Sequence, residues 1–146
     1  MKLKQIIVIL LAVIIIMITV CFNTLANDGF LIRLNWGINL PNSDRTIYYI
    51  DSNPFFNGDY EAYKILEYKT KNKIAKLNNI KWIAKKDTII EEKINSILSG
   101  LKVKEENYPS FNSNYRYYYL KEEDSSELFM INQPNDNKLY VIENTY

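Results

Sequence analysis

An uninterrupted apolar run dominates the start of the chain. Residues Ile6 to Phe22 contain no charged side chain, and Lys2 and Lys4 precede them. Such a run cannot form an amphipathic surface helix, because no face of that helix is polar. The pattern predicts a helix that lies in a membrane, with residues 1–26 as a transmembrane anchor or a signal segment.

Length favours the anchor over a cleaved signal. A bilayer core of roughly 30 Å takes about 20 helical residues, with about 17 as the lower limit, whereas the apolar part of a signal peptide spans about 7 to 15 residues. The alternative is a secreted protein, because Thr24 and Ala26 permit cleavage after Ala26.

Charges beside the run predict its orientation. Lys2 and Lys4 precede it, and Asp28 is the first charged residue after it. The positive-inside rule then places the N-terminus in the cytoplasm and makes this a single-pass protein of the cell membrane with an extracellular C-terminal domain. We interpret residues 27–45 as a connector and residues 46–146 as the extracytoplasmic domain.

The connector shows an alternating pattern. Leu34, Trp36, Ile38 and Leu40 are separated by single residues, as on one face of an extended segment. We expect Trp36 to belong to the core, because a large ring on such a face usually covers a sheet.

The remaining chain predicts seven elements. Apolar periodicity and turn residues favour, in order, strands at 46–50 and 60–68, helices at 70–79 and 88–99, and strands at 115–121, 128–132 and 138–143. Short polar turns between the last three strands favour antiparallel neighbours. The order ββααβββ indicates an α+β domain with a five-stranded, mainly antiparallel sheet and helices on one face.

The second helix carries the clearest signals. Five apolar residues form one stripe of period 3.6, namely Ile90, Ile94, Ile97, Leu98 and Leu101. Thr88 and Glu91 are spaced as a capping box. Gly100 is expected to end the helix in a left-handed conformation.

Composition narrows the chemistry. The chain has no histidine and a single cysteine, Cys21, within the apolar run. Ser-His and Cys-His nucleophiles, a histidine base and histidine-ligated zinc are therefore excluded. Residues 27–146 carry 16 basic and 17 acidic side chains, a net charge of −1, which argues against a nucleic-acid partner. We expect no catalytic activity and no cofactor.

One loop is rich in oxygen ligands. Asp51, Asn53, Asn57, Asp59 and Glu61 lie on a predicted turn, and calcium binds six to eight such oxygens. The spacing matches no EF-hand loop, and Pro54 interrupts it. We prefer turns stabilised by Asp and Asn side chains to a metal site.

Paired carboxylates offer an enzymatic alternative. Two acids that face each other across a groove can hydrolyse a glycoside. The candidates are Asp51, Glu61, Glu67, Glu122 and Glu123. Nothing in the sequence selects a pair.

Three alternate tyrosines form a candidate binding surface. On a strand, Tyr115, Tyr117 and Tyr119 share one face and could present an aromatic platform to sugar rings or a protein. The preferred interpretation is that their rings cover the sheet beneath the helices.

Several segments together resemble a known family. They are Trp36 to Pro41, Ile47 to Ser52, Gly58-Asp59, Asp124 to Ser126 and Lys138 to Glu143. They resemble a family of small uncharacterised proteins of Gram-positive bacteria, with an N-terminal hydrophobic segment and one extracytoplasmic domain. The family's loop carries Gly, His and Gly where this chain has Asn53, Asn57 and Tyr60, so no role of that histidine carries over.

These observations favour a membrane-anchored, non-catalytic domain of the cell envelope. Its expected partners are the membrane, through Ile6 to Phe22, and an envelope protein or polysaccharide. The alternatives are a carboxylate-dependent hydrolase that acts on an envelope polymer through the Asp51 to Glu61 loop, and a released secreted factor.

Overall fold

The computed structural model describes residues 3–25, 28–52, 59–112 and 114–146, without the side chains of residues 3, 8 and 21–25. The chain divides into two compact units, Met1–Asn42 and Ser43–Tyr146. Each unit is described separately below.

The first unit contains two helices, α1 (Leu3–Leu25) and α2 (Asp28–Trp36). The apolar run is therefore helical, and the described side chains of α1, at 4–7 and 9–20, are all exposed. Among the described residues, no helix meets the length and hydropathy required of a membrane span.

The extended segment predicted over Leu34 to Leu40 is wrong in its first part, because residues 28–36 form α2, whereas residues 37–40 lie outside any helix and Leu40 is buried as the alternation predicted. Gly29, Ile32 and Trp36 are its buried residues, and their spacing is that of one helical face. Leu34, which the alternating pattern placed beside Trp36, is 67% exposed. The prediction that Trp36 belongs to the core is confirmed, since it is only 5% exposed.

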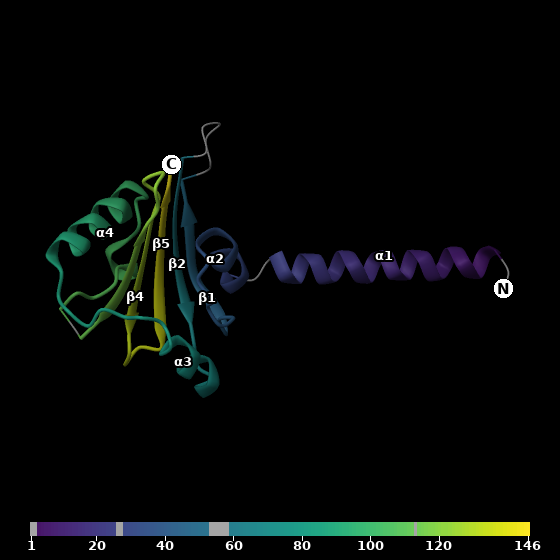
Figure 1. Ribbon diagram of the computed structural model, residues 1–146, viewed down its shortest axis with the longest axis horizontal. Helices are drawn as coiled ribbons and strands as arrows, with labels where there is room; N and C mark the ends of the chain where they lie inside the picture. Colours follow the sequence, from purple (N-terminus) through teal and green to yellow (C-terminus); the bar gives the residue numbers. More distant parts are fainter. Residues whose placement is uncertain (1–2, 26–27, 53–58, 113) are drawn as a thin grey trace. The chain divides into compact units, whose positions relative to one another are not determined.

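The second unit is an α+β fold, as predicted (Figure 1). Two helices, α3 (Lys71–Leu77) and α4 (Thr88–Gly100), and a short 3-10 turn, η1 (Glu105–Asn107), lie between the second and third strands. The five strands are β1 (Arg45–Asp51), β2 (Tyr60–Glu67), β3 (Arg116–Lys121), β4 (Glu127–Gln133) and β5 (Lys138–Thr145). All neighbours are antiparallel, in the spatial order β1-β2-β5-β4-β3. The order ββααβββ and the five-stranded sheet are confirmed.

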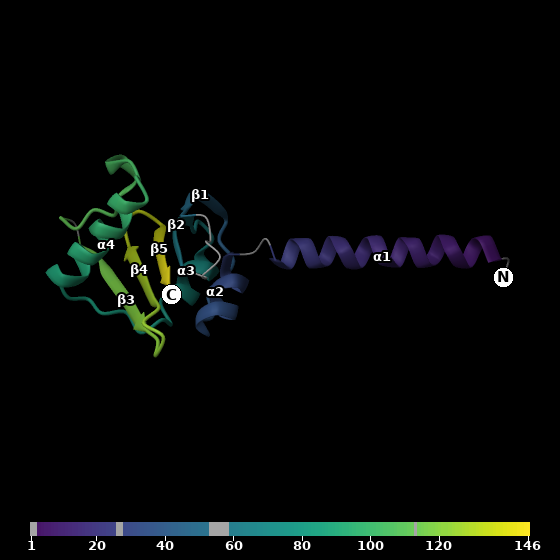
Figure 2. The ribbon, with the colours of Figure 1, turned by 90° about the horizontal axis from the view of Figure 1, so that it is seen from above.

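The main core lies between α4 and one face of the sheet (Figures 1 and 2). The apolar stripe of α4 packs against inward side chains of β2, β3, β4 and β5, among them Tyr63, Tyr117, Phe129 and Ile142. Ile90, Ile94, Ile97 and Leu98 are all buried, because the 3.6-residue spacing places them on one side of the helix.

The opposite face of the sheet is also buried. Leu128, Met130, Leu139 and Val141 have no exposed surface, although they alternate with the residues that face α4. The consecutive apolar residues of β4 and β5 are thus covered on both faces, as a sheet centre requires.

The helices do not share one face, contrary to the prediction. α4 covers the face that carries Ile131, whereas the end of α3 contacts Arg116 and lines a cavity with Asn132, on the opposite face. A strand alternates its side chains between faces, so neighbouring residues of β4 meet different helices.

The ends of α4 also differ from the prediction. Asp87, not Thr88, is the N-cap, and its carboxylate accepts hydrogen bonds from the amides of Ile89 and Ile90. Gly100 remains helical, and the left-handed residue is Lys102, at φ 56°. The cap therefore begins one residue earlier than predicted, and the Glu91 amide, which the Thr88 cap was expected to bind, donates to the Asp87 backbone carbonyl at 3.0 Å.

Candidate ligand-binding site

Only the two ends of the oxygen-rich loop belong to the described residues. Asn53 and Asn57 lie outside the described residues, as does the turn between them. Asp51 accepts a hydrogen bond from the Tyr49 hydroxyl at 2.5 Å, and the Glu61 amide donates to Ser52 Oγ at 3.0 Å. Within the described part of the chain, no three acidic or cysteine side chains converge as metal ligands.

The tyrosines of β3 do not form an exposed platform. Tyr117 is 6% exposed, and Tyr115 and Tyr119 pack against the same core beneath α4. This packing agrees with the preferred interpretation that the rings cover the sheet beneath the helices, and it leaves Tyr117 little exposed surface for a ligand. An alternating aromatic strand looks the same in sequence whether its inner face meets a helix or a ligand.

The hydroxyls of these tyrosines all point to acids at the core's edge. Tyr115 donates to Glu91 Oε1 at 2.6 Å, and Tyr117 donates to Asp87 Oδ2 at 3.1 Å. Burial, followed by the bond to Glu91, raises the pKa of Tyr115 to about 12. Tyr119 donates to Glu127, which also accepts from Lys93 Nζ at 2.6 Å. These bonds hold α4 to β3, and the acids serve in them as hydrogen-bond acceptors that stabilise the fold.

The acids proposed for hydrolysis lie in three places. Glu67 lies 3.1 Å from Lys69 Nζ and 3.7 Å from Arg45 Nε, while Glu122 and Glu123 are exposed in the turn after β3. Asp51 and Glu61 belong to the β1–β2 hairpin instead. No pair among the described acids is singled out for catalysis.

A different place in the second unit has the features of a binding site. A cavity of about 250 Å³ lies between the end of α3 and the β4–β5 turn. Its walls combine apolar residues with carboxamides and one guanidinium, and consist of Tyr68, Ile74, Leu77, Asn78, Arg116, Asn132, Gln133, Pro134 and Asn137.

Arg116 is the only ionised side chain in this wall. Its Nε donates to Asn132 Oδ1 at 2.9 Å and its Nη2 donates to Asn78 Oδ1 at 2.5 Å. Its guanidinium also lies 5.2 Å from the centre of the Trp82 ring, a cation–π contact. The position of this cation is therefore fixed by three neighbours.

No carboxylate balances Arg116 within the described residues. The ion pairs there join other cations to acids, at Glu67, Glu143, Asp44, Glu127 and Glu106. Desolvation by burial lowers the pKa of Arg116. A half-buried cation that is solvated by amides instead of a counterion has the character of an anion-binding group.

The connector between α3 and α4 brings Trp82 to this site. Ile83 pairs with Tyr117 on the edge strand β3, through backbone bonds of 2.7 and 3.0 Å. The Trp82 indole donates to the Leu77 carbonyl at 2.8 Å, and the same carbonyl also accepts from the Ile80 amide at 3.2 Å, so the ring is tied to the end of α3. These bonds place the ring beside Arg116, the residue before Tyr117.

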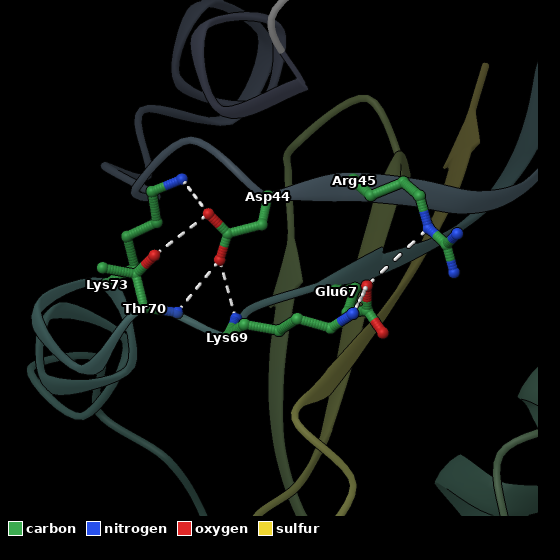
Figure 3. A network of polar contacts seen from close by, with 6 residues as sticks. All are labelled: Asp44, Arg45, Glu67, Lys69, Thr70 and Lys73. Atoms are coloured by element: carbon green, nitrogen blue, oxygen red, sulfur yellow. Dashed lines mark hydrogen bonds and ion pairs between the residues drawn. The ribbon is translucent and has the colours of Figure 1, made fainter.

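Asp44 fixes the other end of α3 (Figure 3). Its carboxylate accepts from Lys73 Nζ at 2.5 Å and from the amides of Lys69 and Thr70 at 2.7 and 3.1 Å. The bond to Lys73, followed by those to the two amides, holds the pKa of Asp44 far below its usual value. The network ties the start of α3 to the start of β1, and so steadies the helix whose other end supplies Asn78.

The β4–β5 turn forms the cavity's rim. Asn137 has a left-handed backbone, at φ 53°, and its carbonyl accepts from the Tyr68 amide at 2.8 Å. Gln133 donates its side-chain amide to the Ser110 carbonyl at 2.7 Å. Asn is among the few residues that adopt this conformation readily, so the turn is held open at a defined position.

Comparisons with known protein families, curated proteins and solved structures yield no match. The site is therefore interpreted from its own geometry.

Proposed function

We propose that this chain is a membrane-anchored protein whose helix α1 crosses the bilayer once. Its folded domain then lies outside the cell and binds a component of the envelope, a protein or a polysaccharide, without catalysing a reaction. The observation that carries this proposal is α1 itself, 23 residues long and built on an uncharged run of sequence.

Although no helix in the described residues combines the length and the hydropathy required of a membrane span, the length of α1 alone is close to the thickness of a bilayer core. At 1.5 Å per residue its axis is about 34 Å long, close to the roughly 30 Å of a bilayer core. Its described apolar side chains, for example Ile14 and Met17, are exposed. Burial of this surface in lipid removes an energetic cost that water imposes.

The orientation follows from the flanking charges. Lys2 and Lys4 precede the run, and Asp28 is the first charge beyond it. Basic residues remain on the cytoplasmic side, so the domain is placed outside. The cavity beside Arg116 supplies a feature of that domain suited to binding.

We also propose membership of the Gram-positive family that the sequence resembles. The segments that support it are Trp36 to Pro41, which begins at the end of α2, Ile47 to Ser52 in β1 and Lys138 to Glu143 in β5.

Membrane fractionation tests the anchor. The full chain, expressed in a bacterium, is expected to stay with membranes after an alkaline carbonate wash. Ile14→Lys places a charge near the middle of α1, which costs roughly 2.5–3.5 kcal/mol on insertion scales, and should release the protein. Ser96→Lys adds the same charge at an exposed position of α4 and should not.

Two outcomes would separate the alternatives. A full-length chain in the soluble cytosolic fraction would overturn the anchor. A mature chain that begins at Asn27 in the culture medium, identified by mass spectrometry, would instead establish the secreted factor.

A further inference from the structure

We propose that the cavity beside Arg116 binds the carboxylate of a small organic acid, about the size of one amino-acid residue with a free C-terminus. The inference rests on the proposed function only in making this cavity the place where the binding role is exercised.

Unused hydrogen-bond donors support an anionic ligand. A guanidinium has five N–H groups, and Arg116 uses two of them, toward Asn132 and Asn78. The other three have no partner among the described residues. Paired N–H groups of a guanidinium match the two oxygens of a carboxylate, so Arg116 can accept such a ligand without losing its present contacts.

The cation is held in place before any ligand arrives. Asn132 is buried, with 5% exposure, and its amide donates to the Lys138 carbonyl at 3.3 Å. Trp82 is fixed through its bond to Leu77. A donor whose position is already set loses little conformational entropy on binding. A ligand with a single negative charge can therefore bind there.

The charge and size of the cavity favour a singly charged carboxylate. Arg116 is the only ionised group in the wall, and the other polar groups are neutral carboxamides. A doubly charged phosphate would retain an uncompensated charge. A volume of about 250 Å³ lies below the 300–1,000 Å³ typical of sites for drug-sized ligands, so the ligand is small.

The wall also suits a short apolar group. Ile74, Leu77 and Pro134 supply apolar lining to the cavity, and Asn78, Asn132 and Asn137 supply amides. Amides pair with a peptide group, and apolar lining accepts a small side chain. The ligand class is therefore a carboxylate attached to an amide and a short hydrocarbon.

Another cavity among the described residues, of about 340 Å³, lacks this arrangement. Lys85 and Lys86 supply its cations, and both are exposed. Exposed lysines are flexible and well hydrated, so they fix no ligand geometry.

Nuclear magnetic resonance of the full chain in detergent micelles tests the proposal. N-acetylalanine is the probe, and the Arg116 Nε–H and Trp82 indole signals report the site. A saturable shift of both signals is expected. N-acetylalaninamide has the same shape without the charge, and its affinity should be lower by a factor of about ten or more.

Two variants assign the response to Arg116. Arg116→Gln removes the charge, and Asn78→Asp supplies an internal carboxylate to Nη2 with almost no change in shape. Each should weaken binding about tenfold or more, read from the Trp82 signal. Asn95→Asp adds the same charge at an exposed site on α4 and should bind as the parent does. The signals of Asn78→Asp outside the cavity should match those of the parent, which would show that its fold is intact.

Three results would overturn the assignment. They are equal shifts with N-acetylalanine and its amide, parental binding by Asn78→Asp, and stronger saturable binding of inorganic phosphate. Because the measurement is made in micelles, it is independent of membrane orientation. The membrane topology and the ligand site are therefore tested by separate experiments, and one proposal can be wrong while the other holds.

Discussion

Lys64 and Glu143 form an ion pair within the sheet, with 3.4 Å between Nζ and Oε1. Their side chains are 7% and 4% exposed, and they lie on the adjacent strands β2 and β5. Both belong to the face opposite α4, among apolar neighbours such as Val141. An ion pair so placed opposes unfolding only while both charges are present, because either one alone is buried without a counterion.

Loss of Glu143 should therefore destabilise the fold strongly. Glu143→Gln removes the carboxylate that lies 3.4 Å from the buried Lys64 ammonium, and the free energy of unfolding should fall by about 3–5 kcal/mol. Denaturant unfolding of the full chain in micelles measures it. The double variant Lys64→Met with Glu143→Leu should recover most or all of this loss, since apolar replacement of a buried pair is often neutral or stabilising. A single variant as stable as the parent would show that the pair is dispensable.

Asp44 predicts a dependence of stability on acid pH. Its folded-state pKa lies well below the ordinary value of 3.8, chiefly because of Lys73. A depressed folded-state pKa gives stability that is present above the unfolded pKa and is lost as pH falls toward the folded one. The midpoint temperature of thermal unfolding should thus be nearly constant from pH 7 to 5 and should fall below about pH 4.

The variant Asp44→Asn isolates this contribution. It should be less stable than the parent at pH 7, and its stability should fall less on acidification. Some slope should remain, because bonds to backbone amides also lower the pKa of Asp87 and Asp124. Glu92→Gln, at an exposed position, serves as the control. A parental acid profile in Asp44→Asn would refute the assignment.

Tyr117 should behave as a core residue and not as a ligand contact. Tyr117→Ala removes a nearly buried ring and should cost about 3–5 kcal/mol of stability. Tyr118→Ala, one position along β3 on the opposite face and only half-buried, should cost clearly less. Urea unfolding compares the two. An equal and small effect of both would mean that the strand's inner face is not packed under α4.

Local patterns predicted the second unit well because its elements carry their own signals. The apolar stripe from Ile90 to Leu98 and the β-branched run at β1 each indicate the type of element and where it ends. Contacts between elements carry no such mark: the pairing of β2 with β5 joins residues such as Tyr63 and Ile142, far apart in sequence.

The connector was misjudged because two periods coincide there. Leu34, Trp36, Ile38 and Leu40 alternate as a strand would, while Ile32 and Trp36 are also spaced as neighbours on a helix. A nine-residue helix offers too few turns for periodicity alone to decide.

The binding cavity could not be predicted from the sequence. Asn78 and, beside the cavity, Trp82 follow α3, whereas Arg116 lies in β3 and Asn132 in β4, and the bridge between Ile83 and Tyr117 brings Trp82 and Arg116 together. The one local signal was Arg116 itself, a charge placed among tyrosines at the start of β3. Neither the oxygen-rich loop nor the aromatic platform shares this location.

The central claim, a single membrane crossing that places the domain outside, is tested most directly by cysteine labelling in intact cells. Cys21→Ala first removes the only cysteine of the sequence. In that background, Lys4→Cys and Glu123→Cys are each labelled with a membrane-impermeant maleimide, and the extent of labelling is compared. Glu123→Cys should react in intact cells, and Lys4→Cys only after permeabilisation. Protection of both sites until lysis, or the reverse pattern, would contradict the account.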